Sequence, residues 1–216
     1  MNWANEHVNA IVQAWYPGEE GGAAIADVLF GDYNPAGRLP VTFYKSVDQL
    51  PPFENYAMAG RTYRYFKGEP LYPFGHGLSY TTFKYSDLKV SSGRIPTTDN
   101  VQLSVIVENS GKREGDEVVQ LYLTREKATV PVPIRSLAGI ERIHLKPGER
   151  RVVSFTVNPR QLVIITDDGR TVVEPGELKV TIGGKQPGFT RSADASTTSF
   201  VEGRFSLTGT ATELKR

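Results

Sequence analysis

Apolar and polar residues alternate regularly over the second half of the chain. The apolar residues Val101, Leu103, Val105 and Val107 alternate with the polar residues Gln102, Ser104 and Glu108, and the same period of two recurs at 153–157 and 178–182. This alternation predicts half-buried β-strands. The stretch 117–123 is more continuously apolar, which indicates a central strand, and 199–207 is predicted to form the last strand.

Turn signals separate these predicted strands. Lys146-Pro147-Gly148-Glu149 has Pro and Gly at the two central positions of a type II turn, and Asp167–Arg170 and Glu174–Gly176 mark further reversals. About seven strands with frequent turns predict an antiparallel sandwich of immunoglobulin-like type. The chain has no cysteine, which argues against a disulfide-bonded antibody domain and leaves the sandwich itself open.

The first part of the chain has a different pattern. The apolar run 10–16 predicts a buried strand, 21–30 has helical spacing, and 39–43 can form a second short strand. One strand-helix-strand unit cannot bury both faces of its sheet. We therefore expect an incomplete α/β fragment over 1–83, followed by an all-β sandwich over 84–212.

Glu19 and Glu20 are adjacent acids at the start of the predicted helix, and Gly31 stands at its expected end. Acids in a first helical turn are stabilised by the helix dipole, and this is the favoured reading. A place at the rim of a ligand pocket is the second, since ligands often bind loops that follow strands. A catalytic pair is the third and least favoured reading, because the side chains of neighbouring residues at a helix start point in different directions.

Residues 44–83 show no periodicity but contain six tyrosines and several prolines. An ordered loop of this length is rare and indicates function or a surface that it wraps. Within it, Arg61-Thr62-Tyr63-Arg64-Tyr65-Phe66 alternates bases with aromatics. Single-stranded nucleic acid is one reading of that alternation. We favour rings that fix the loop to its neighbours, with Arg61 and Tyr63 as weak candidates for substrate contact.

Charge and composition exclude several classes of partner and cofactor. The 25 basic residues balance 24 acids, so no general field attracts nucleic acid or an anionic membrane. No apolar run approaches a membrane span. The three histidines are far apart and cysteine is absent, so no metal site is expected. Gly18–Gly22 lacks the dinucleotide spacing and carries two acids that would repel phosphate, so no cofactor is expected either.

Several stretches resemble glycoside hydrolase family 3, in the family's order and over nearly the whole chain. They are Ala14–Gly22, Ala26–Pro40, Lys45–Pro51 and Tyr72–Tyr80. Downstream, four further stretches resemble the family's fibronectin type III-like domain: Val107–Gly111, Gly115–Tyr122, Leu145–Glu149 and Glu174–Gly176.

The resemblance implies a plan of a (β/α)8-type barrel, an α/β sandwich domain and a fibronectin-like domain, in retaining exo-acting enzymes, mostly β-glucosidases and β-xylosidases. In that family the nucleophile is an aspartate on the barrel and the acid/base is usually a glutamate early in the α/β domain. Neither has a matching position in this chain. We therefore expect no catalytic residue here, a catalytic barrel and the remaining α/β domain as partners, and oligosaccharide binding only in the intact enzyme.

The rival hypothesis is a non-catalytic carbohydrate-binding or interaction module of the sandwich type. It would need exposed aromatic rows on a sheet face, and the strands offer only the isolated Tyr122 and Phe155, of which Phe155 is expected to face inward. Trp3 and Trp15 could stack on sugars, although packing is the more common role of an apolar-strand tryptophan such as Trp15.

The loop 60–66 and the sequence Pro73-Phe74-Gly75-His76-Gly77 look slightly more like the β-xylosidase branch. Sugar, linkage and compartment stay open. A secreted or periplasmic location would suit the intact enzyme, whose leader is expected to precede this chain.

Overall fold

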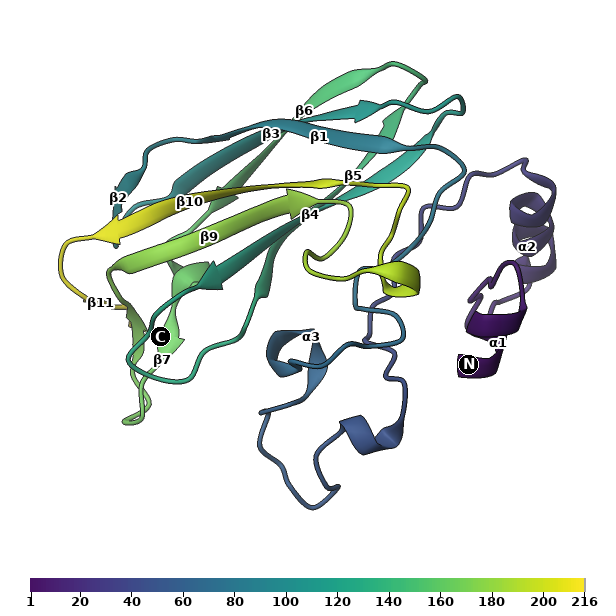
Figure 1. Ribbon diagram of the computed structural model, residues 1–216. Coiled ribbons are helices and arrows are strands. Elements are labelled where there is room, and N and C mark those ends of the chain that lie inside the picture. Colours follow the sequence, from purple (N-terminus) through teal and green to yellow (C-terminus); the bar gives the residue numbers. More distant parts are fainter. Residues whose placement is uncertain (216) are drawn as a thin grey trace.

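The alternating segments of the second half form strands that pack as two facing sheets (Figure 1). The computed structural model describes residues 1–215. The strands of the three-stranded sheet, in spatial order, are β1 (Phe83–Val90), β3 (Val101–Asn109) and β6 (Arg150–Val157). Those of the five-stranded sheet are β2 (Arg94–Pro96), β10 (Phe200–Thr208), β9 (Gly176–Gly183), β4 (Gly115–Arg125) and β5 (Ser136–Leu145).

A third, small sheet contains β11 (Thr212–Glu213), β8 (Thr171–Val173) and β7 (Ile164–Ile165). The α-helices are α1 (Asn2–His7), α2 (Gly21–Phe30) and α3 (Thr62–Tyr65). Residues 1–215 also form three short 3₁₀ helices: η1 (Val47–Gln49), η2 (Pro159–Leu162) and η3 (Arg191–Ala193).

The core lies between the two large sheets. Every second residue of β3 from Val101 to Val107 is buried, and so are Leu121 of β4 and Val180 of β9 from the facing sheet. Strand β4 lies between β9 and β5, so the prediction of a central strand at 117–123 is confirmed. Phe155 of β6 faces this core, as expected.

Two glycines adopt the left-handed backbone that their positions require. Gly148 has φ +75°, and the Glu149 amide donates to the Lys146 carbonyl at 2.9 Å, which confirms the type II turn. Gly31 has φ +84° directly after α2, and its amide donates to the Asp27 carbonyl, so the predicted helix end is confirmed as well.

The expected strand at 10–16 is absent, and every residue of that stretch is exposed. A strand requires neighbouring backbone to accept its hydrogen bonds, and the described chain places none beside this run. Residues 39–43 form only an isolated bridge, from Phe43 to Tyr72. The expectation that Trp15 is packed was wrong: it is 49% exposed, and its ring lies 6.1 Å from that of Phe43. The α/β character of the first part therefore rests on α2.

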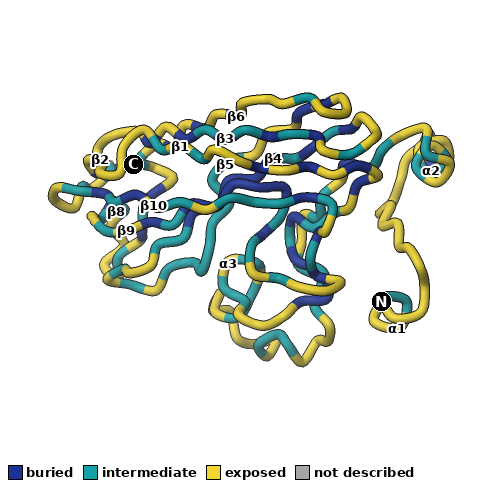
Figure 2. Tube along the Cα trace, turned by 45° about the horizontal axis from the view of Figure 1, so that its top comes forward, coloured by how far each residue is buried: buried dark blue, intermediate teal, exposed yellow. Residues whose placement is uncertain are grey.

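Burial rises along the chain from the N-terminal segment to the sandwich (Figure 2). In the figure, α1 and α2 are largely exposed or half-buried and lie at one side of the sheets, whereas the residues that follow α3 run beside the sandwich. Residues 1–215 contain no helix long and apolar enough to cross a membrane.

Replacing Leu121 with Ala should lower the free energy of unfolding of the sandwich by about 2–4 kcal/mol, because apolar contact is lost and a cavity remains. Chemical denaturation monitored by fluorescence measures the change. Ile140→Ala on the neighbouring strand is the matched control: Ile140 is 62% exposed, and its replacement should cost less than about 0.5 kcal/mol. Similar losses for both variants would contradict the assigned core.

Candidate functional site

The two acids singled out in the sequence lie at the surface. Glu20 is the residue immediately before α2, neither Glu19 nor Glu20 falls in its first turn, and no side chain caps the helix. Both residues are exposed. The expected placement in the first helical turn was therefore wrong by one or two residues. Among residues 1–215, no hydrogen bond links Glu19 or Glu20 to another carboxylate.

Arg61 is occupied by the backbone of its own loop. Its guanidinium donates to the carbonyl oxygens of Asn55 at 2.6 Å, Pro52 at 3.2 Å and Ala57 at 3.3 Å. These bonds hold the segment 52–57 in a closed turn. The Nε and Nη2 donors of Arg61 are thus used within the loop.

Tyr63 fixes the irregular segment 44–83, here called the connector, to the outer face of the five-stranded sheet. Its ring stacks on Phe74 at 4.3 Å and meets Tyr122 edge-on at 6.3 Å. Its hydroxyl accepts a hydrogen bond from the Leu137 amide at 3.2 Å. Aromatic pairs of this geometry stabilise a fold by more than the burial of their apolar area alone provides. Tyr122, an isolated aromatic in the sequence, is therefore the buried base of this contact.

A buried ion pair joins the two parts of the chain. Arg38 Nη2 lies 2.6 Å from Glu117 Oε2, and the two side chains are 6% and 0% exposed. The hydroxyls of Tyr85 and Thr198 donate to Glu117 Oε1. Arg38 also donates to the Gly184 carbonyl at 3.3 Å. Both carboxylate oxygens are satisfied, which a buried charge requires.

Burial raises the pKa of the Glu117 carboxyl, while the positive charge of Arg38 and the hydroxyls of Thr198 and Tyr85 oppose that rise. Burial also raises the pKa of the Tyr85 phenol well above its usual value, and the neighbouring Glu117 charge adds to the effect. Tyr85 therefore stays protonated and keeps donating to the carboxylate.

His76 is a half-buried titratable group at this junction. Burial lowers the pKa of its imidazole to about 4, and the charge of Arg38 acts in the same direction. Its ring lies 5.1 Å from that of Tyr72, and its Nδ1 has no hydrogen-bond partner among the described residues. The side chain is thus neutral at physiological pH.

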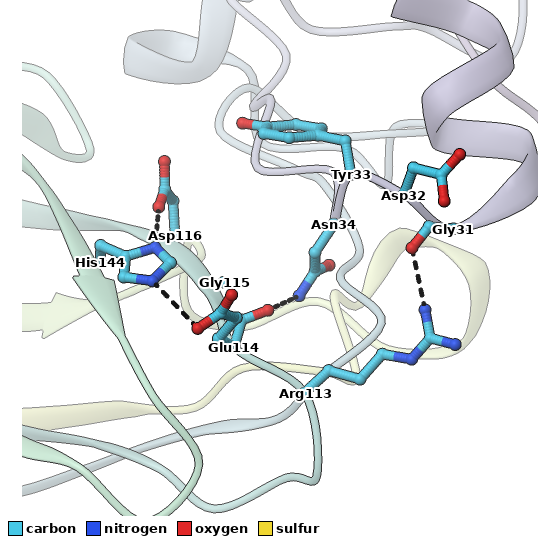
Figure 3. Close-up of a pocket in the computed structure, with 9 residues that line it drawn as sticks. All are labelled: Gly31, Asp32, Tyr33, Asn34, Arg113, Glu114, Gly115, Asp116 and His144. Carbon is cyan, nitrogen blue, oxygen red and sulfur yellow. Dashed lines mark hydrogen bonds and ion pairs between the residues drawn. The ribbon is translucent and has the colours of Figure 1, made fainter.

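A pocket of about 350 Å³ lies between the loop after α2 and the sandwich (Figure 3). Arg142, beside it on β5, donates to Asp116 at 2.7 Å and to the Tyr33 hydroxyl at 2.6 Å. The ring of His144 lies 2.7 Å from the other Asp116 oxygen. Burial acts to raise the pKa of the Asp116 carboxyl, but the hydrogen bonds from His144 and Arg142 outweigh it, so the pKa is lowered.

The polar groups of this pocket largely pair with one another across the junction. Asn34 donates to the Glu114 carbonyl at 3.0 Å, and Arg113 donates to the Gly31 carbonyl at 3.3 Å. Within residues 1–215, no three His, Cys, Asp or Glu side chains converge as metal ligands. The arrangement holds two parts of the chain together.

The sequence reasoning missed Arg38 and Glu117. A signal was present: Glu117 has the same parity as the core residues Val119 and Leu121, so it occupies an inward-facing position of β4. A charged residue at such a position requires a partner. The sequence could not identify that partner, because Arg38 lies 79 residues away.

Comparison with known proteins places both parts of the chain. The profile described as Glycosyl hydrolase family 3 C-terminal domain matches residues 1–80, and the Fibronectin type III-like domain matches 117–186. The chain is 45% identical to the periplasmic β-glucosidase of Salmonella typhimurium over 83% of its length, and 46% identical to a xylan 1,4-β-xylosidase of Xylanibacter ruminicola over 82%. It covers 25% and 20% of those two proteins.

The solved structures that this chain resembles are also β-glucosidases. The β-glucosidase 3B of Thermotoga neapolitana, in complex with α-D-glucose, superposes with a TM-score of 0.79 at 33% identity, over 94% of this chain and 28% of that protein. A β-glucosidase from Erythrobacter marinus gives a TM-score of 0.79 at 40% identity, over 95% of this chain and 26% of that one. The chain thus spans about a quarter of the length of the proteins it matches.

Replacing Arg38 with Met should lower the free energy of unfolding at neutral pH by about 3–5 kcal/mol, because Glu117 is left buried and unpaired. Without Arg38 the folded-state pKa of Glu117 rises further. The folded state then binds a proton that the unfolded state releases, so the deficit should shrink as the pH falls towards about 4.5.

Denaturant titrations at several pH values measure this dependence. The double variant Arg38→Met/Glu117→Gln should recover part of the loss. Arg150→Met, which removes an exposed pair with Glu108, should cost less than about 1 kcal/mol. A deficit for Arg38→Met that does not change with pH would contradict the proposed role of the Glu117 charge.

Proposed function

Because the chain belongs to the C-terminal region of glycosyl hydrolase family 3, we propose that it is the structural C-terminal part of a retaining, exo-acting β-glycosidase of β-xylosidase or β-glucosidase type. Its partners in that enzyme are a catalytic barrel and the rest of the α/β domain. The oligosaccharide substrate is bound by the assembled enzyme. The observation that supports this proposal is the uncovered apolar surface of residues 1–58.

Large apolar side chains are exposed along this N-terminal stretch. Trp3 is 68% exposed, and Leu29 and Phe30 of α2 are 63% and 84% exposed. Ile11 and Trp15 on the irregular run before the helix are also exposed. Contiguous exposed apolar surface marks an interaction site. A helix with an uncovered apolar face is completed when further elements of an α/β layer pack against it.

The carboxylates of this chain support a structural role. Retaining glycoside hydrolysis uses two carboxyl groups about 5–5.5 Å apart, a nucleophile and an acid/base. Glu19 and Glu20 are exposed neighbours on an irregular loop. Glu117 is fully buried and paired with Arg38. None of these acids stands beside a second carboxylate across an open site.

The observations do not favour a sandwich-type sugar-binding module that uses a sheet face. Such a face needs exposed aromatic side chains, whereas Tyr122 and Phe155 are buried. Arg61 and Tyr63 are also occupied by contacts within the chain. They therefore provide no basis for choosing between a β-xylosidase and a β-glucosidase.

The 216-residue protein alone should not hydrolyse aryl β-glucosides or aryl β-xylosides, because it supplies no pair of catalytic carboxylates. Release of the aryl leaving group, followed by absorbance, measures this, with an intact β-glycosidase as positive control. Turnover by the pure protein that disappears in Glu19→Gln would overturn the proposal, since it would place catalysis on this chain.

Backbone amides of residues 10–30 should exchange with deuterium much faster than those of Val101–Val107, because few tertiary contacts cover the first stretch. Hydrogen exchange read by mass spectrometry on a dilute monomer measures the difference. The sandwich strands provide the internal reference. Equal protection of the two stretches would mean that the N-terminal segment is complete by itself, contrary to the proposal.

A further inference from the structure

A groove of about 690 Å³ lies where the connector meets two loops of the sandwich. It is lined by residues 66–69, 134–135 and 188–191. Three of these residues are cations, namely Lys67, Arg135 and Arg191. The one acid of the lining, Glu69, is paired with Lys45 at 2.8 Å. The groove therefore carries net positive charge.

Arg135 distinguishes this groove from an ordinary solvated basic patch. Its Nη1 donates to Gln186 Oε1 at 2.9 Å and to the Pro187 carbonyl at 3.0 Å. Gln186 is 3% exposed and is itself fixed by a bond to the Phe74 carbonyl at 2.6 Å. The guanidinium lies over the Phe189 ring at 5.5 Å. The side chain is thus half-buried and held in one orientation.

No carboxylate neutralises Arg135 within the part of the chain that the structure describes. It takes part in none of the ion pairs there, and its Nη2 and Nε have no hydrogen-bond partner among those residues. Burial lowers the pKa of its guanidinium without changing its charge at physiological pH. Charges removed from water are normally compensated by an opposite charge or by hydrogen bonds, and the Nη2 and Nε donors of Arg135 have neither among the described residues. The unpaired guanidinium edge therefore indicates an anionic ligand.

The walls of the groove are held by backbone contacts rather than left free. The Ile134 amide donates to the Arg64 carbonyl at 2.7 Å, which ties α3 to the loop before β5. Arg191 has φ +55°, in the left-handed region that is unfavourable for a residue with a Cβ. Non-glycine residues kept in this region cluster at ligand sites.

We propose that this groove binds the carboxylate of an acidic sugar, a uronic acid residue of the oligosaccharide, and this rests on the proposed function as part of a β-glycosidase. A guanidinium edge matches a carboxylate with two parallel hydrogen bonds. Lys67 and Arg191 add positive charge at the rim. Phe66, Ile134 and Phe189 supply apolar walls for the sugar ring.

A sugar fits this groove better than a segment of polypeptide does. The exposed apolar side chains that would dock another part of the enzyme are concentrated in residues 1–58. The rim of the groove, in contrast, is charged, with Lys67, Glu69 and Arg191 exposed. Charged surface of this kind is depleted at the centre of protein–protein contacts.

Titration of the 216-residue protein, followed by NMR, tests the proposal with two probes. One is a xylo-oligosaccharide that carries a glucuronic acid branch, and the other is the same oligosaccharide without the branch. The acidic probe should bind about tenfold tighter, the ratio expected for one charged hydrogen-bonded contact. It should shift the resonances of Gly188 and Arg191, and added salt should weaken its binding.

Arg135→Gln and Arg191→Gln should each remove most of this preference. Arg94→Gln, at an exposed arginine of β2 outside the groove, is the matched control and should keep it. Arg191 is exposed, so its variant reports on binding even if Arg135→Gln perturbs folding.

Three results would overturn the proposal: no binding of the acidic probe, equal binding of both probes, or equal binding of a short polyglutamate peptide. The last would assign the groove to a polypeptide carboxylate. Since the measurement is binding to this chain, each result can occur while the structural role in a glycosidase stands. Hydrolysis by the chain alone would refute that role without affecting the binding result.

Discussion

The carboxylate of Glu117 is the contact on which the relation between the two parts of the chain depends. It lies at an inward-facing position of β4, at the end of the sandwich core, and it is fully buried. A charge in that place is tolerated only because Arg38 reaches it from the N-terminal segment and two hydroxyls donate to it. Arg38 in turn donates to the Gly184 carbonyl, so one side chain joins the segment to both β4 and the turn after β9. The pair gives this junction a single preferred geometry, since any displacement would leave an uncompensated charge.

The aromatic connector extends this junction across the sheet. Tyr63 and Phe74 pack on Tyr122, and the buried Gln186 bonds to the Phe74 carbonyl. The part of the N-terminal segment that follows α3 is therefore bound to the sandwich. Within the described structure, residues 1–30 make no buried ion pair or aromatic contact with the sandwich, and they expose apolar side chains such as Trp3 and Phe30. This difference in burial is what a structural C-terminal region requires: one side anchored to the sandwich, and the other available to the rest of an α/β layer.

The proposed anion groove depends on the same anchoring. Gln186 has two bonds, one to the connector and one to Arg135, so the residue that fixes the loop after β9 also orients the guanidinium. Packing between the two parts of the chain thereby creates a site that neither part would form alone. It lies at loops, where binding residues on a rigid scaffold are most often found.

The sequence by itself determined the sandwich, α2 and the turns at Gly31 and Gly148, because strand alternation, helical spacing and left-handed glycines are local properties of the chain. It also carried the family resemblance. Only the tertiary structure decided the state of residues 10–16, since an apolar run becomes a strand only when neighbouring backbone pairs with it. The tertiary structure likewise decided the roles of Arg61 and Tyr63, whose groups are used by carbonyls and rings that the fold brings to them. The position of Glu117 in the alternating pattern of β4 indicated a buried charge. Its partner, however, lies 79 residues away, and local spacing contains no information about such a contact.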